Sequence, residues 1–183
     1  MFEPAILLPI AAFIALAAGL AFVFRGTGRI VARARELETF RAGVNDLTAR
    51  VDASLGGAVG QIDAVRRRQV DPGAIMETLV AATDAMERYS AEAKGLRGPR
   101  KAQGIRSELV AELERAQRAL GMVEHGTSIM VAVPRGPREL EAQTSIKRGY
   151  LNLIHARASI ARCALEAREF VSDRDPQNEG RIV

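Results

Sequence analysis

Residues 29–69 read RIVARARELETFRAGVNDLTARVDASLGGAVGQIDAVRRRQ, and this stretch decides the fold. Apolar residues recur along it at helical spacing and keep to one face of a wheel of about 100° per residue. That face consists of Ile30, Leu37, Phe40, Val44, Leu47, Val51, Leu55, Ala58, Ile62 and Val65. The pattern therefore predicts a single long amphipathic helix.

The spacing within this face bears on how the helix packs. One set of positions repeats every seven residues from Ile30 to Val65, while the companion set slides in phase after Leu47. A sustained coiled coil would hold both sets in phase. We therefore favour a helix packed in a bundle, with a dimeric coiled coil as the second option.

Three glycines, Gly56, Gly57 and Gly60, interrupt the long helix. Each costs about 1 kcal/mol relative to alanine in a helix. Because the apolar face has the same phase on both sides, we expect the helix to continue through them. We favour close approach of a neighbouring helix as the reason for the glycines, and a hinge between a stalk and a head is the alternative.

Upstream, residues 5–24 contain no charged side chain. About 20 helical residues at ~1.5 Å each span the ~30 Å hydrocarbon core of a bilayer. No basic residue precedes this run in Met1–Pro4, whereas a cleavable signal peptide would begin with one. We therefore predict an uncleaved, single-pass transmembrane helix.

The charges that follow this segment predict its orientation. Arg25, Arg29, Arg33 and Arg35 come before the first acid, Glu36. An excess of arginine beside a membrane span is typical of the cytoplasmic side. We therefore expect residues 1–4 outside, the rest of the chain on the cytoplasmic face of the plasma (inner) membrane, and the four arginines in contact with anionic headgroups.

Small residues inside the predicted span suggest self-association. Ala11, Ala15 and Gly19 have a four-residue spacing that lets two transmembrane helices approach closely. They are our candidates for a contact between two copies within the membrane.

Three further helices follow the long one. Asp71, Pro72 and Gly73 predict a turn and a helix start, and that helix extends to about Lys94. The next two span about 105–125 and 137–171, which makes the fold all-α and the simplest architecture an antiparallel four-helix bundle over residues 25–172. The first turns of the long helix then form a stalk, and residues 173–183 a disordered tail.

The connection from Gly126 to Pro137 contains an apolar run, Ile129–Val133, that is too short to span a membrane. We favour the interpretation that it caps the end of the bundle. An exposed patch that binds a partner is the alternative.

One charged residue falls on an apolar face. The wheel of the last helix places Arg157 among Ile146, Tyr150, Leu153, Ile154, Ala161, Ala164 and Leu165. A buried guanidinium requires a carboxylate partner, and Glu112 at the edge of the preceding helix's apolar face is our candidate. Such a pair would fix helix register.

Residues able to carry chemistry are sparse. Neither His125 nor His155 has a second ligand at helical spacing, and Cys163 lies on the outer side of its helix by the wheel. No phosphate-binding glycine motif occurs, and Arg66–Arg68 lack interleaved aromatics for nucleic acid. We therefore expect no enzyme activity, metal, cofactor, small-molecule substrate or nucleic-acid partner.

The order of elements, together with the string Gln61, Ile62, Asp63 followed by Arg66–Arg68, resembles the LemA-type architecture. That resemblance implies an N-terminal membrane helix and a small cytosolic helical bundle, and it implies no established chemistry.

These patterns favour a membrane-anchored cytoplasmic scaffold or interaction module that binds a protein partner or itself. The alternative is a membrane-tethered sensor or binder of anionic lipid headgroups or another anionic ligand. A nucleic-acid-binding membrane protein is the third and least favoured option, since a net charge of +4 is small for binding nucleic acid.

Overall fold

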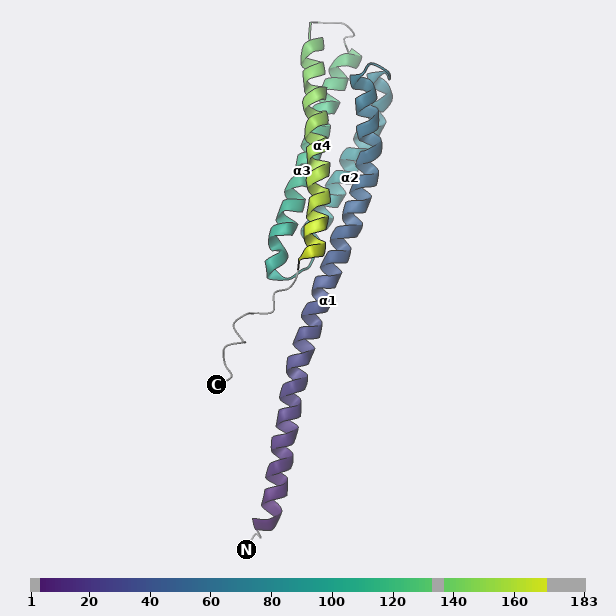
Figure 1. Cartoon of the computed structure of the whole chain (residues 1–183). Helices are drawn as coiled ribbons and strands as arrows, with labels where there is room; N and C mark the ends of the chain where they lie inside the picture. The colour runs from purple at the N-terminus through teal and green to yellow at the C-terminus, as the bar shows by residue number, and fades with distance from the viewer. Residues whose placement is uncertain (1–3, 133–136, 171–183) are drawn as a thin grey trace, which may run out of the picture.

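The computed structural model describes the backbone of residues 4–132 and 137–170, and the side chains of that part except residues 4–15 and 17–30. It contains four long helices: α1 (Pro4–Arg66), α2 (Met76–Gly95), α3 (Gln103–Ala132) and α4 (Glu139–Glu169) (Figure 1). The described part of the chain contains no strand. The all-α prediction is therefore confirmed.

The helices form an up-down-up-down bundle. α1 packs against α2 and α4, and α3 packs against the same two helices, so α1 and α3 are diagonal partners (Figure 1). At ~1.5 Å per residue, α1 is about 95 Å long and α4 about 47 Å. The N-terminal half of α1 therefore extends alone beyond the other helices. We call the end of the bundle farthest from this extension the distal end. It carries the α1–α2 turn, the C-terminal end of α3 and the N-terminal end of α4.

The core face of α1 is the one predicted from its sequence. Its eight central residues are at most 2% exposed: Phe40, Val44, Leu47, Val51, Leu55, Ala58, Ile62 and Val65. The slide in phase occurs where two four-residue steps follow each other, from Leu47 to Val51 to Leu55. Such an insertion locally unwinds a heptad pattern. It lets a straight helix keep its apolar face toward the core of the bundle.

Gly56, Gly57 and Gly60 of α1 do not mark a close approach. α1 continues through all three, as expected. A Cβ added at Gly57 or Gly60 would meet nothing within 4 Å, and one at Gly56 would meet only the Arg157 guanidinium, at 3.7 Å. The favoured prediction of a closely packed neighbour is therefore wrong, because Gly57 and Gly60 face solvent and Gly56 meets only a side chain at van der Waals distance. The hinge stays a prediction.

Close approach occurs between α3 and α4 instead. A Cβ added at Gly126 would lie 2.7 Å from the carbonyl oxygen of Ala142, and one at Gly149 would lie 2.7 Å from that of Ala119. Gly126 therefore lies inside α3 as a packing residue, and the predicted connection from Gly126 to Pro137 is corrected. Residues 129–132 of its apolar run form the end of α3.

The side chains of that run divide between the core and solvent. Ile129 is buried and Met130 packs against the core, whereas Val131 is 51% exposed. Residues 133–136 lie outside the described part of the chain.

Both described turns have local causes. In the α1–α2 turn, Arg68 has a left-handed backbone conformation with φ 59°. Asp71 then accepts a hydrogen bond from the Gly73 backbone N–H at 2.7 Å and caps a 3₁₀ helix, η1 (Pro72–Ile75). A second 3₁₀ helix, η2 (Arg100–Ala102), precedes α3. Gly98 lies just before η2 against the Phe40 ring, where an added Cβ would come within 2.6 Å. The predicted turn and cap at Asp71 are confirmed for η1, and α2 itself begins at Met76.

Each of the four helix interfaces carries at least one ion pair at its surface. Arg50 of α1 pairs with Glu92 of α2, and Lys94 of α2 pairs with Glu114 of α3. Arg162 of α4 pairs with Glu108 of α3 at 3.1 Å. The fourth pair, Asp52–Arg157, joins α1 to α4. Exposed pairs of this kind contribute about 0–1 kcal/mol each, so they complement an apolar core rather than replace it.

The predicted membrane segment falls mostly outside what the structure describes. Residues 5–24 are helical as part of α1, but of their side chains only Leu16 is described. Within the described residues, no helix combines the length and the apolar character that a membrane crossing requires. Ala11, Ala15, Gly19, Arg25 and Arg29 also lie among the undescribed side chains, and the predicted tail of residues 173–183 lies outside the description.

Candidate functional site

The predicted ion pair between Glu112 and Arg157 does not form. The Arg157 Nε donates instead to Asp52 Oδ1 at 2.6 Å, and the Arg157 side chain is 39% exposed. This hydrogen bond lowers the pKa of Asp52 and raises that of Arg157. Glu112 is 7% exposed and pairs with Arg115 of its own helix at 2.8 Å. Arg157 thus connects α4 to α1 at the bundle surface.

This error follows from an incorrect assignment of the buried face of α4. The core residues follow alternating steps of four and three residues: Ala142, Ile146, Gly149, Leu153, Ala156, Ile160, Cys163 and Ala167. Ile154, Ala161 and Leu165, predicted to face inward, are exposed. Cys163, predicted outside, is fully buried, which raises the pKa of its thiol to about 12.

A second apolar set on the opposite side of α4 caused the misassignment. It comprises four large exposed residues that we call the outer α4 stripe: Leu140, Leu151, Ile154 and Leu165, with 76%, 44%, 38% and 55% exposure. At about 100° per residue, all four lie within roughly 60° of one another, facing away from the core. An average over both faces gives a direction between them, which is the direction predicted from the sequence.

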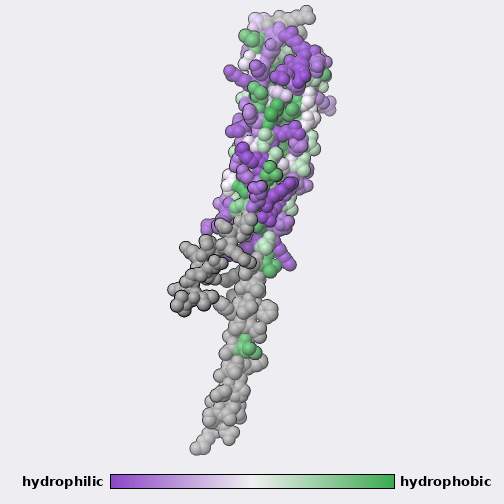
Figure 2. Space-filling model, viewed as in Figure 1, coloured by the Kyte–Doolittle hydropathy of each residue, from purple (hydrophilic) through white to green (hydrophobic). Residues whose placement is uncertain are grey.

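The stripe extends along the outside of the bundle. Figure 2 shows the side of the molecule that carries α4 and α1, where hydrophobic residues lie between hydrophilic ones over the length of the bundle. Large apolar side chains that gather on one exposed face of a folded domain commonly mark a binding face. The outer α4 stripe is therefore the candidate functional site.

At its distal end the stripe enters a groove of about 670 Å³ between α3 and α4. We call this the distal groove; its lining residues are Met122, His125, Pro137, Leu140, Glu141, Thr144, Ser145 and Arg148. Met122 is 40% exposed and adds apolar surface beside Leu140. The groove therefore combines an apolar floor with a polar rim.

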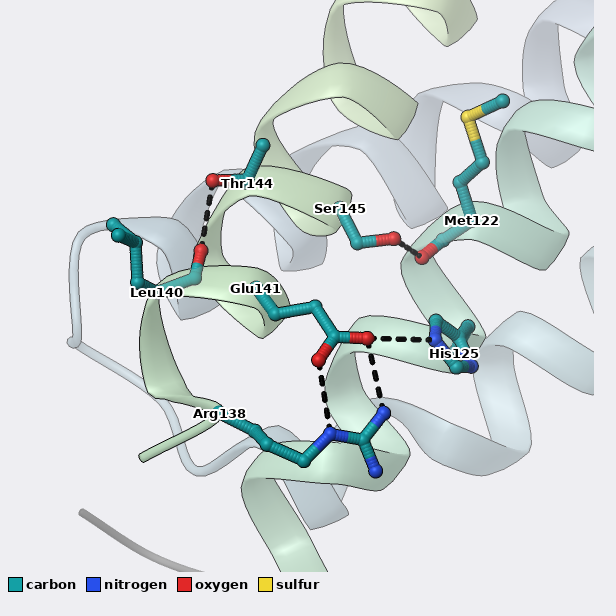
Figure 3. A network of polar contacts seen from close by, with 7 residues as sticks. All are labelled: Met122, His125, Arg138, Leu140, Glu141, Thr144 and Ser145. Atoms are coloured by element: carbon teal, nitrogen blue, oxygen red, sulfur yellow. Dashed lines mark hydrogen bonds and ion pairs between the residues drawn. The ribbon is translucent and has the colours of Figure 1, made fainter. Parts of the chain in front are cut away.

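Polar contacts fix the rim of the distal groove (Figure 3). Arg138 donates two hydrogen bonds to the Glu141 carboxylate, both at 2.9 Å, and His125 Nε2 lies 3.7 Å from the same group. The Arg138 hydrogen bonds lower the pKa of Glu141. Ser145 of α4 donates to the Met122 carbonyl of α3 at 2.7 Å. Glu141 therefore presents a fixed negative charge at one end of the stripe.

A smaller basic cavity of about 230 Å³ opens at the distal end between α1, α3 and α4. Arg66, Arg68 and Lys147 contribute its cations, with Met130 and Ile146 among its apolar walls. Arg66 pairs with Asp63 and stacks on the Tyr150 ring, and Arg68 pairs with Glu139 at 3.0 Å. Lys147 has no ion-pair partner among the described residues.

The remaining predicted residues offer no reactive cluster. His125 and His155 are exposed, as expected, and no group of three or more metal-ligating side chains occurs in the described part of the chain. Arg33 and Arg35 are exposed on the isolated part of α1. The structure does not bring them near the outer α4 stripe.

Comparison with known proteins finds no matching family model, curated protein or solved structure. The resemblance to the LemA-type architecture therefore stays an analogy, and function has to be argued from the surface of the bundle.

Proposed function

We propose that this chain is a membrane-anchored, non-enzymatic scaffold whose helical bundle binds a protein partner through the outer α4 stripe. The exposure of Leu140, Leu151, Ile154 and Leu165 carries the proposal. Large apolar side chains left in solvent along one helix cost free energy that a partner helix would recover, at about 25 cal/mol per Å² covered. The uncharged segment 5–24 and the arginines after it support the membrane location.

Site-specific photo-crosslinking in intact membranes tests this proposal. A crosslinking residue at Leu151 should give protein adducts, because that side chain lies in the middle of the stripe. The matched control is Val80 of α2, which is similarly exposed, at 49% against 44% for Leu151, but lies outside the stripe. Equal labelling from both positions, or no adduct from position 151, would reject the proposal.

The basic cavity supports a second candidate, the binding of an anionic ligand such as a lipid headgroup. Lys147 provides a positive charge beside apolar walls, which suits a ligand with an anionic and an apolar part. Salt-sensitive binding of a 25–183 fragment to anionic vesicles, weakened by Lys147→Gln, is the expected result. Binding that Lys147→Gln leaves unchanged would remove the cavity from this role.

A further inference from the structure

We propose that the occupant of the outer α4 stripe is the α4 helix of a second copy, packed antiparallel. The inference rests on the proposed function, because it names the protein partner. It is argued from the spacing of the stripe and from the charges that flank it.

The stripe is symmetric about its centre. Leu151 lies eleven positions after Leu140, Ile154 lies three positions after Leu151, and Leu165 lies eleven positions after Ile154. When two copies of such a helix pack antiparallel, Leu140 lies opposite Leu165 and Leu151 lies opposite Ile154. The pairing therefore places every large exposed apolar residue of the stripe against another one.

The smaller positions between them fit the same register. Thr144, Lys147, Ala158 and Ala161 complete alternating four- and three-residue steps from Leu140 to Leu165. In the antiparallel pair, Lys147 lies opposite Ala158, and its aliphatic stem can cover the alanine while the ammonium reaches solvent. A parallel pair would instead place Lys147 against Lys147 inside the interface, which is unfavourable for like charges.

The flanking charges favour the same direction. Glu141 and Arg162 each directly follow a position of this series, Leu140 and Ala161, so they flank it on the same side, and the antiparallel pair brings each beside the other in the second copy. Two-fold symmetry gives two such pairs. In a parallel pair, a residue that flanks the interface on one helix contacts the flanking residue five positions further along the other helix. A parallel pair would therefore place Arg157 near Arg162 of the second copy. Glu141 and Arg162 are 50% and 58% exposed, so each can add this contact to the pair that it already makes within its own copy, Glu141 with Arg138 and Arg162 with Glu108.

Disulfide crosslinking of the full chain tests both the partner and its direction. Leu140→Cys and Leu165→Cys variants carrying tags of different size are mixed and oxidised. We expect a mixed dimer that joins positions 140 and 165 and little dimer from either variant alone. The wild-type chain is the control, because its single cysteine, Cys163, is buried.

Addition of Leu151→Glu and Ile154→Glu to both variants should abolish the mixed dimer, whereas Val80→Glu should leave it intact; circular dichroism checks that each variant is folded. Dimers that form from each variant alone, and do not increase on mixing, would show a parallel pair and overturn the inference. Absence of any dimer would overturn it as well. If adducts from position 151 then contained a different protein, the proposed function would stand without this partner.

Discussion

Gly149 and Gly57 are both helical glycines, but their surroundings differ. A side chain at Gly149 would press on the α3 backbone at the Ala119 carbonyl and on the Val123 side chain, whereas one at Gly57 would project into open space. Backbone cannot yield as a flexible side chain can. Gly149 therefore determines the separation of α3 and α4, whereas Gly57 determines no helix separation.

We expect Gly149→Ala to lower the free energy of unfolding by about 1–3 kcal/mol, as overpacking of a closed interface does. Gly57→Ala should raise it by about 0.5–1 kcal/mol, because alanine is the better helix former and no clash opposes it. Chemical denaturation of the two variants beside wild type measures both changes. A stabilising Gly149→Ala would contradict the close packing of α3 on α4.

Cys163 is the buried titratable residue whose pKa departs most from its ordinary value. Burial, reinforced by Glu108 and Glu166, raises the pKa of its thiol from 9.0 to about 12. Above pH 9 the unfolded chain therefore releases this proton while the folded chain retains it. Because the folded state binds more protons there, stability should fall as pH rises from 9 toward 12.

Comparison with Cys163→Ala isolates this contribution from the lysines and tyrosines that titrate in the same range. We expect the unfolding free energy of wild type to fall more steeply with pH than that of the variant, measured by urea denaturation at successive pH values. Parallel curves for the two proteins would show that the thiol is not held in an apolar environment.

At the scale of single helices, α1 and α4 show what sequence periodicity can predict. α1 has one apolar face, so the wheel gave its core correctly over eight consecutive core positions. α4 has two opposite apolar faces, and a single average direction placed Ile154 and Leu165 inside and Cys163 outside. The core of α4 is built largely from Ala and Gly, whose contribution to an apolar face is small. The sequence signal that would have separated the faces was the symmetric 11–3–11 spacing of the outer stripe.

The Asp52–Arg157 pair connects these two helices and lies at the surface. The Arg157 hydrogen bond lowers the pKa of Asp52, so its contribution to stability should be present above the ordinary pKa of an aspartate and be lost as pH falls through the lowered value. A double-mutant cycle with Asp52→Asn and Arg157→Gln should give a coupling energy of no more than about 1 kcal/mol, reduced by salt. The corresponding cycle between Glu112 and Arg157 should give no coupling energy. A measurable coupling energy in this second cycle would show that the ion pair predicted from the sequence does form.

For the whole molecule, the direction of the proposed α4 pairing has a consequence for the isolated part of α1. That part leaves the bundle at the end opposite the distal end (Figure 1). In an antiparallel dimer the two extensions therefore leave at opposite ends. If residues 5–24 anchor each copy, the dimer connects two facing membrane surfaces, since two copies in one flat bilayer would have to point the same way.

Vesicle clustering tests this geometry. Full-length chain reconstituted with its bundle outward, as checked by protease accessibility, should cluster vesicles, and dynamic light scattering measures the increase in particle size. Leu151→Glu with Ile154→Glu should prevent clustering, whereas Val80→Glu should not. If the 140–165 crosslink forms in detergent but vesicles stay dispersed, the antiparallel dimer holds and its role in connecting two membranes is wrong. If vesicles cluster equally with the double variant, a surface other than the outer α4 stripe connects them.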